Sequence, residues 1–265
     1  MRKPVPKSLN LQNLVKIKSV ILRTFFLLII TTFATSSLFG QNEKVINEVF
    51  RYIYNQQFHE ADSLLAAQHK KTELFYFDIL TIDLNWWRHV IYPSELTSKQ
   101  FNTLLKSMKQ ERTDTPDKKI KHLVWLSYRL RFEFKRYNII GAIRLRSEIK
   151  NLLEEIQVNE LNYSNNRKKL FYLYNALFRY FNNIVNPFFS ETKRNERENA
   201  LLEIERYTRD DDLIISTLSA YFIGKIYLNI EKDPLKANRH FKTLTDRYPQ
   251  NTIFRELFSE SAKRS

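Results

Sequence analysis

The stretch from Ser219 to Asn251 constrains the fold of this chain more than any other, because small and large residues fall there where two packed antiparallel helices require them. Gly224 and Ala237 would let the two helices approach closely, since neither carries a bulky side chain. The other positions of the pattern hold larger or helix-ending residues: Tyr227 near the turn, Phe241 and Leu244 in the groove, and Pro249 after the second helix. The pattern therefore predicts a helical hairpin.

This hairpin resembles a tetratricopeptide repeat, in which a pair of antiparallel helices stacks with further pairs into an α-solenoid. The spacing from Tyr227 to Ala237 is one residue longer than the usual pattern of the repeat. Asp233 followed by Pro234 is a good helix start, so we expect the extra residue to be accommodated in the turn.

A second, weaker copy of the pattern lies nearer the amino terminus, where Tyr52 and Ala61 keep the usual spacing of nine residues. Between the two copies the pattern decays, although apolar residues recur at helical spacing. Glycine, with 3 residues in 265, is too scarce for the tight turns of a strand-rich protein. The sequence thus predicts an all-α fold, and the resemblance implies a right-handed α-solenoid of degenerate helix pairs, with about 10–11 helices over residues 41–265.

Residues 1–40 have the composition of a secretory signal peptide. Six basic and no acidic residues are followed by an apolar run from Thr24 to Phe39, whose 16 residues fall short of a membrane span. We expect cleavage after Gly40, with a cut after Ser36 as an alternative. This predicts an exported bacterial protein of the periplasm or cell envelope, with residues 41–265 as its helical repeat domain.

The charge of the chain argues against nucleic acid as a partner. Lys and Arg exceed Asp and Glu by 14, but by only 8 without the six basic residues of the predicted signal. A local basic patch remains from Arg129 to Lys150, which is either a solvated face or a contact for an anionic surface. The absence of cysteine excludes disulfides and lipid attachment at a cysteine.

The sequence carries no motif for catalysis or metal binding. The five histidines are scattered, and no two have the close helical spacing of a zinc site. The acidic run 210–212 directly precedes an apolar segment, so we expect it to cap a helix and not to bind a cation. Trp86 and Trp87 fit packing against the core and a neighbouring helix. We therefore expect no enzyme, no metal and no cofactor.

The resemblance implies a non-catalytic scaffold that binds a protein or peptide partner in a concave groove, lined by the first helix of each pair. It points to Tyr221, Lys225 and Asn229 in the last repeat and to Tyr54 in the first as partner-binding residues. The alternative is a membrane-anchored sensor or assembly subunit, in which the amino-terminal segment is retained as a signal anchor. Attachment to a membrane through this segment is expected only in that case.

Overall fold

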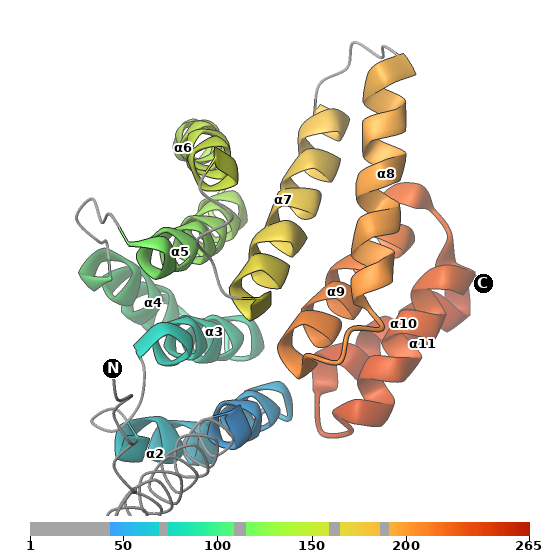
Figure 1. Cartoon of the computed structure of the whole chain (residues 1–265). Coiled ribbons are helices and arrows are strands. Elements are labelled where there is room, and N and C mark those ends of the chain that lie inside the picture. Colours follow the sequence, from blue (N-terminus) through green and yellow to red (C-terminus); the bar gives the residue numbers. More distant parts are fainter. Residues whose placement is uncertain (1–42, 69–73, 109–114, 159–164, 186–190) are drawn as a thin grey trace, which may run out of the picture. The chain divides into compact units, whose positions relative to one another are not determined.

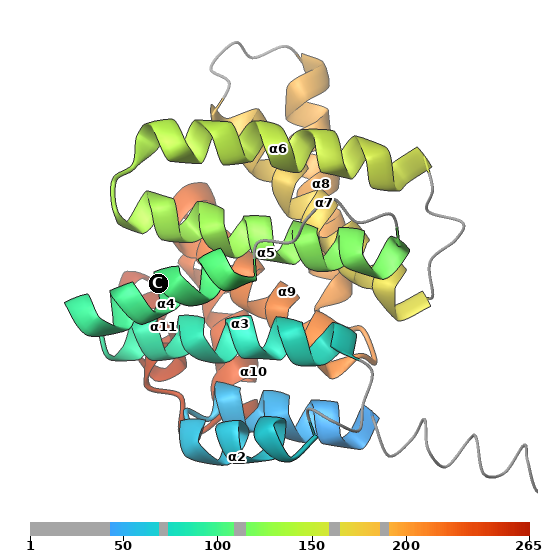
Figure 2. The same ribbon diagram turned by 90° about the vertical axis from the view of Figure 1, so that its left-hand side faces the viewer.

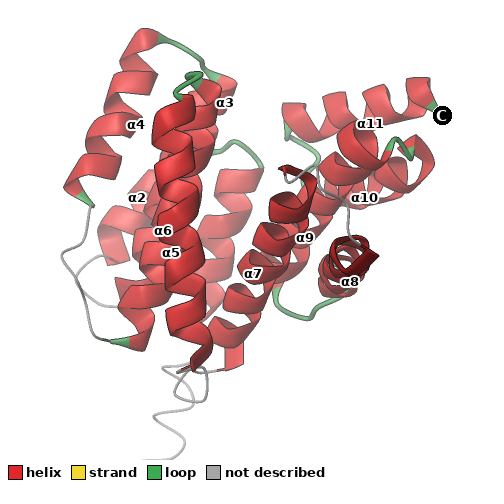
Figure 3. Ribbon diagram, turned by 90° about the horizontal axis from the view of Figure 1, so that it is seen from above, coloured by secondary structure: helices red, strands yellow, loops and turns green. Residues whose placement is uncertain are grey.

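The computed structural model describes residues 43–68, 74–108, 115–158, 165–185 and 191–265. The predicted signal peptide lies outside these residues. From Ile46 to Ser265 the chain forms one compact unit. Within the described ranges the secondary structure consists of eleven α-helices and the π-helical turn η2. Figure 3 shows these ranges as helices and loops, without a strand. The predicted all-α class is therefore confirmed.

The helices, shown in Figure 1, have the following bounds: a first helix over residues 43–54, α2 (Phe58–Gln68), α3 (Leu74–Ile91), α4 (Glu95–Ser107), α5 (Pro116–Lys135), α6 (Ile139–Val158), α7 (Asn165–Val185), α8 (Glu191–Tyr207), α9 (Leu213–Ile226), α10 (Pro234–Arg247) and α11 (Thr252–Arg264). Helices that follow each other in the chain pack together: α3 with α4, α5 with α6, α7 with α8, and α10 with both α9 and α11. In addition, α3 contacts α5, α5 contacts α7, and α7 contacts α9. The chain is thus built mostly from sequential helix pairs.

Two helix starts follow the sequence-based prediction. The Asp212 carboxylate accepts hydrogen bonds from the backbone N–H of Ile214 at 2.8 Å and of Ile215 at 3.1 Å, so it caps α9. Within the acidic run 210–212, Asp210 instead forms an ion pair with Lys169. The Asp233 side chain caps α10, whose first residue is a proline. Both caps satisfy backbone N–H groups that have no partner inside the helix.

The hairpin predicted from Ser219 to Asn251 is present, and the structure shows how its extra residue is accommodated. After α9 the helix continues for one π-helical turn, η2 (Tyr227–Glu231), before α10 begins. A π turn closes its hydrogen bonds over one more residue than an α turn, so it absorbs the insertion within the helix. We expected the extra residue in the turn that follows, and this placement was wrong.

The close approach predicted at Gly224 is confirmed. A Cβ atom at this glycine would lie 2.8 Å from Cε1 of Phe241 on α10, closer than real Cβ contacts allow. Phe241 is fully buried. The hairpin thus depends on the absence of a side chain at this position.

α9 and η2 together form a helix that is apolar enough to cross a membrane by length and composition, from Leu213 to Glu231. Within the described unit, 67% of this stretch is buried by other parts of the structure. Its neighbours are α7, α8 and α10. These contacts are those of a central helix in a helical core.

The first and last parts of the unit are in contact with each other. Nδ2 of Asn251 donates a hydrogen bond of 2.7 Å to the backbone carbonyl of Tyr54. The ring of Phe254 on α11 packs 6.1 Å from that of Tyr54 and 5.6 Å from that of Trp87. In a simple solenoid each pair contacts only its neighbours. This contact is therefore a departure from the predicted α-solenoid, and burial of large aromatic rings from both ends accounts for it.

Candidate functional site

A cavity of about 570 Å³ lies between α3, α5, α6, α7 and the α9–η2 helix. Its size is that of a pocket for a small ligand or for a few side chains of a partner. Most of its lining is apolar or aromatic: Trp86, Leu130, Phe134, Ile149, Tyr174, Leu177, Phe178, Phe181, Tyr221, Phe222, Ile226 and Ile230. Because such walls gain free energy when they are covered, this cavity is the best candidate for a binding site in the described chain.

The charged residues in the lining are all cations: Arg131, Arg146 and Lys225. The guanidinium carbon of Arg131 lies 3.9 Å from the ring centroid of Tyr128 and 5.1 Å from that of Trp86. Stacking on aromatic faces holds the guanidinium group in place. Its Nη2 atom is buried and has no hydrogen-bond partner.

The other cations extend the positive character of the cavity. Nη2 of Arg146 donates a hydrogen bond to the Asn182 side chain, and Nζ of Lys225 lies 5.5 Å from the ring centroid of Tyr221. Among the described residues, no carboxylate forms an ion pair with Lys225. Burial and the charge of Lys225 together lower the pKa of Lys135. The two lysines are therefore near each other. A concentration of positive charge beside apolar walls favours a ligand that is both apolar and anionic.

The buried carboxyl group of Asp83 lies close enough to Arg131 to interact with its charge. The Tyr128 hydroxyl donates a hydrogen bond to Asp83, which is 3% exposed. Burial raises the pKa of Asp83 to about 6, and the hydrogen bond from Tyr128 and the charge of Arg131 limit this rise. Asp83 does not line the cavity. Its hydrogen bond holds the hydroxyl group of Tyr128, the ring on which Arg131 stacks.

The structure brings three of the four predicted partner-binding residues together, since Tyr221, Lys225 and Asn229 all line the cavity. Asn229 belongs to η2, so the extra residue of the repeat lies in the turn that supplies part of the wall. Tyr54 lies elsewhere. It is 1% exposed, and its ring stacks on Phe50 at 4.2 Å in the aromatic cluster that joins the two ends of the unit. The end contact covers the face on which we expected Tyr54 to meet a partner.

The basic patch from Arg129 to Lys150 does not form one continuous surface. Arg129 is paired with the buried Glu133 at 2.6 Å, and Lys150 with Glu154 at 3.7 Å. Arg131 and Arg146 line the cavity. The remaining cations of the patch are at or near the connection between α5 and α6: Lys135, Arg136 and Arg144. The patch thus divides between internal pairs, the cavity and one end of a helix pair.

Sequence reasoning missed most of the cavity. It named residues of the last repeat, whereas Arg131, Phe178 and Phe222 contribute from three different helices. Trp86 was interpreted as packing, and it does pack on Phe101 at 5.6 Å, but it also lines the cavity. The repeat resemblance could have indicated these residues. If the first helices of the pairs stack side by side, a residue on the inner face of α9 has counterparts on α3, α5 and α7.

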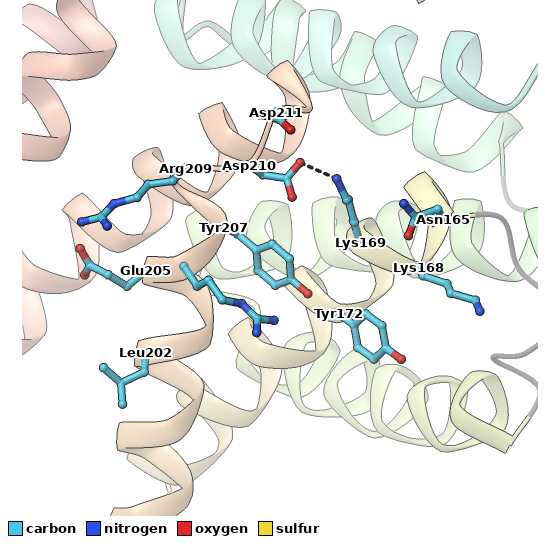
Figure 4. Close-up of a pocket in the computed structure, with 11 residues that line it drawn as sticks. Asn165, Lys168, Lys169, Tyr172, Leu202, Glu205, Tyr207, Arg209, Asp210 and Asp211 are labelled. Carbon is cyan, nitrogen blue, oxygen red and sulfur yellow. Dashed lines mark hydrogen bonds and ion pairs between the residues drawn. The ribbon is translucent and has the colours of Figure 1, made fainter.

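A second, open hollow of about 770 Å³ lies between α7 and α8, near the start of α9 (Figure 4). Its lining mixes both signs of charge. Lys169 forms an ion pair of 2.8 Å with Asp210, drawn as a dashed line in Figure 4. The Glu205 carboxylate accepts a hydrogen bond from Tyr227 at 2.7 Å and contacts His240 at 3.1 Å. The named charges are thus already paired within the protein.

Comparisons with known proteins identify no family. No protein-family model matches the sequence, and a search of curated proteins finds no match. In the described part of the chain, no group of three or more histidine or carboxylate side chains is placed to hold a metal ion. The candidate site therefore has to be interpreted from its own geometry.

Proposed function

We propose that the protein is a non-catalytic scaffold of the cell envelope, built from degenerate tetratricopeptide-like helix pairs, which binds a segment of a protein or peptide partner in the cavity. The observation that carries this proposal is the agreement between two independent lines. The repeat resemblance assigns Tyr221, Lys225 and Asn229 to the concave face, and the same residues line the apolar cavity. Contacts between α3 and α5, α5 and α7, and α7 and α9 support a stacked arrangement of first helices around it.

The lining also indicates which partner segment would fit. Large apolar side chains would replace water against the aromatic wall, and an acidic group would meet Arg131 and Lys225. The guanidinium group of Arg131 is held beside this wall by stacking on Tyr128 and Trp86.

The test is affinity capture of partners from the native envelope with the wild type and the double variant Lys225→Ala, Asn229→Ala. Both residues are exposed, so the stability of the protein should change little. Loss of polar groups that become buried on binding commonly costs ~1 kcal/mol or more, which corresponds to about fivefold weaker binding. The matched control is Lys242→Ala, Thr243→Ala, on the exposed face of α10. Unchanged affinity of the first double variant would contradict the proposal.

We also propose that residues 1–40 direct export and are then removed. Mass spectrometry of the amino terminus in fractionated cells tests this step. A chain that begins near Gln41 outside the cytoplasm supports it, and a full-length chain in the membrane supports the signal-anchor alternative. A full-length chain in the cytosol would contradict both.

A further inference from the structure

The connection between α5 and α6 carries an unusual cluster of exposed apolar side chains. We refer to residues 134–147 as the α5–α6 tip. Five large apolar residues of this tip are exposed: Phe134 at 54%, Tyr137 at 88%, Ile139 at 55%, Ile140 at 79% and Ile143 at 62%. In the rest of the described chain the exposed large apolar residues are spread over several helices. Such a cluster marks a surface that is covered in the working state of a protein.

Hydrogen bonds fix the backbone of the tip in this exposed arrangement. Asn138 Oδ1 accepts from the backbone N–H of Gly141 at 3.1 Å, and its Nδ2 donates to Glu133 at 2.8 Å. Tyr137 has a φ of 58°, in the left-handed region that residues with a side chain adopt only at a cost in free energy. Its ring gains almost no burial within the unit in return. The apolar side chains of the tip are therefore exposed on a turn whose backbone is held by hydrogen bonds.

The charge of the tip identifies the kind of surface that it fits. The exposed cations of the tip are Lys135, Arg136 and Arg144, whereas Arg146 lines the cavity and the exposed Glu148 follows directly after the tip. The nearest acidic residue before them, Glu133, is buried and paired with Arg129. Isoleucine and tyrosine side chains flanked by lysine and arginine suit the boundary between lipid headgroups and acyl chains, where rings and aliphatic groups insert and cations meet phosphates. The tip lies at one end of the α5–α6 pair, on the left in Figure 2.

We propose that the α5–α6 tip docks the protein on a membrane surface rich in anionic lipid. Tyr137, Ile140 and Ile143 insert at headgroup depth, and Arg136 and Arg144 contact lipid phosphates. This contact is peripheral, so it requires neither a retained signal anchor nor an occupied cavity. It can hold or fail independently of the partner-binding proposal.

The absence of cysteine allows a direct test in the full-length chain. A polarity-sensitive fluorophore is attached at Ile140→Cys, or at the control Leu235→Cys, which is 63% exposed on α10. The probe is a vesicle of phosphatidylglycerol and phosphatidylcholine, compared with phosphatidylcholine alone. We expect a blue shift of the fluorophore at position 140 only, and only with the anionic vesicles. Any attachment through residues 1–40 is common to both variants and does not produce this difference.

The contribution of the cations is measured by adding Arg136→Gln and Arg144→Gln to Ile140→Cys. At ~1 kcal/mol for each cation near an anionic surface, the affinity for these vesicles should fall about 30-fold. Arg255→Gln with Lys263→Gln, both on exposed positions of α11, is the matched control and should change it less. Three results would overturn the proposal: no shift at position 140, equal shifts at both positions, or an affinity unaffected by loss of the tip cations. A shift that depends on protein concentration without vesicles would show that a second copy covers the tip, and would overturn it too.

Discussion

Replacement of Gly224 by leucine tests the packing on which the α9–α10 hairpin depends. The first added atom would lie 2.8 Å from Cε1 and 2.9 Å from Cζ of Phe241, whereas ordinary contacts begin near 3.4 Å. The ring is fully buried, so it must move by about half an ångström or more into neighbours that are already packed. Leucine favours a helix over glycine by about 0.5–1 kcal/mol, which offsets part of the cost. Overpacking should still leave a net loss of about 1–3 kcal/mol.

The assay is urea denaturation followed by circular dichroism, which gives the free energy of unfolding. A double-mutant cycle with Phe241→Leu shows whether the loss arises from this contact, because the smaller side chain leaves room for the new one. We expect the two substitutions together to cost clearly less than the sum of their separate costs. An unchanged midpoint for Gly224→Leu, or additive costs in the cycle, would refute the assigned contact.

Three further predictions concern single side chains, each measured as a free energy of unfolding. Asn251→Ala should cost about 2 kcal/mol or more, because it leaves the buried carbonyl of Tyr54 without its donor and removes the cap of α11; a loss below about 0.5 kcal/mol would contradict the end contact. Asp212→Ala should cost about 1 kcal/mol through loss of the α9 cap, and an unchanged stability would contradict that role. The pKa of Asp83 is raised in the folded state to about 6, so its contribution to stability is present below pH of about 4 and is lost as the pH rises through about 6. Asp83→Asn should therefore gain in stability relative to the wild type between pH 4 and pH 7, and a constant difference would contradict the buried carboxyl.

Local pattern was enough to predict the helical class, the last hairpin and its caps. Gly224, Asp212 and Asp233 act through neighbours within the same hairpin or the same helix turn, so their roles are readable from spacing. The π turn shows the limit of this reasoning. An extra residue can enter a turn or a helix, and only the packing of the whole hairpin decides between them.

The end contact and the cavity depend on residues far apart in the sequence. Asn251 and Tyr54 are separated by 197 positions, and no periodicity links them. The cavity lining similarly combines side chains of five helices, such as Arg131 from α5 and Phe222 from α9. The spacing of residues within the last repeat predicted that Lys225 lies on the inner face of its helix. It could not predict that Tyr54, at the other end, would be covered.

Site-specific photo-crosslinking tests whether the cavity is the partner-binding site. A photoreactive phenylalanine analogue replaces Phe222 in the cavity wall, and the control places it at Tyr92, which is 60% exposed and outside the cavity lining. The full-length chain is irradiated in its native envelope, and adducts are identified by mass spectrometry. We expect a defined protein or peptide adduct from position 222 that is absent from position 92 and is lost with Lys225→Ala, Asn229→Ala. The same adducts from both positions, or none from position 222, would contradict it.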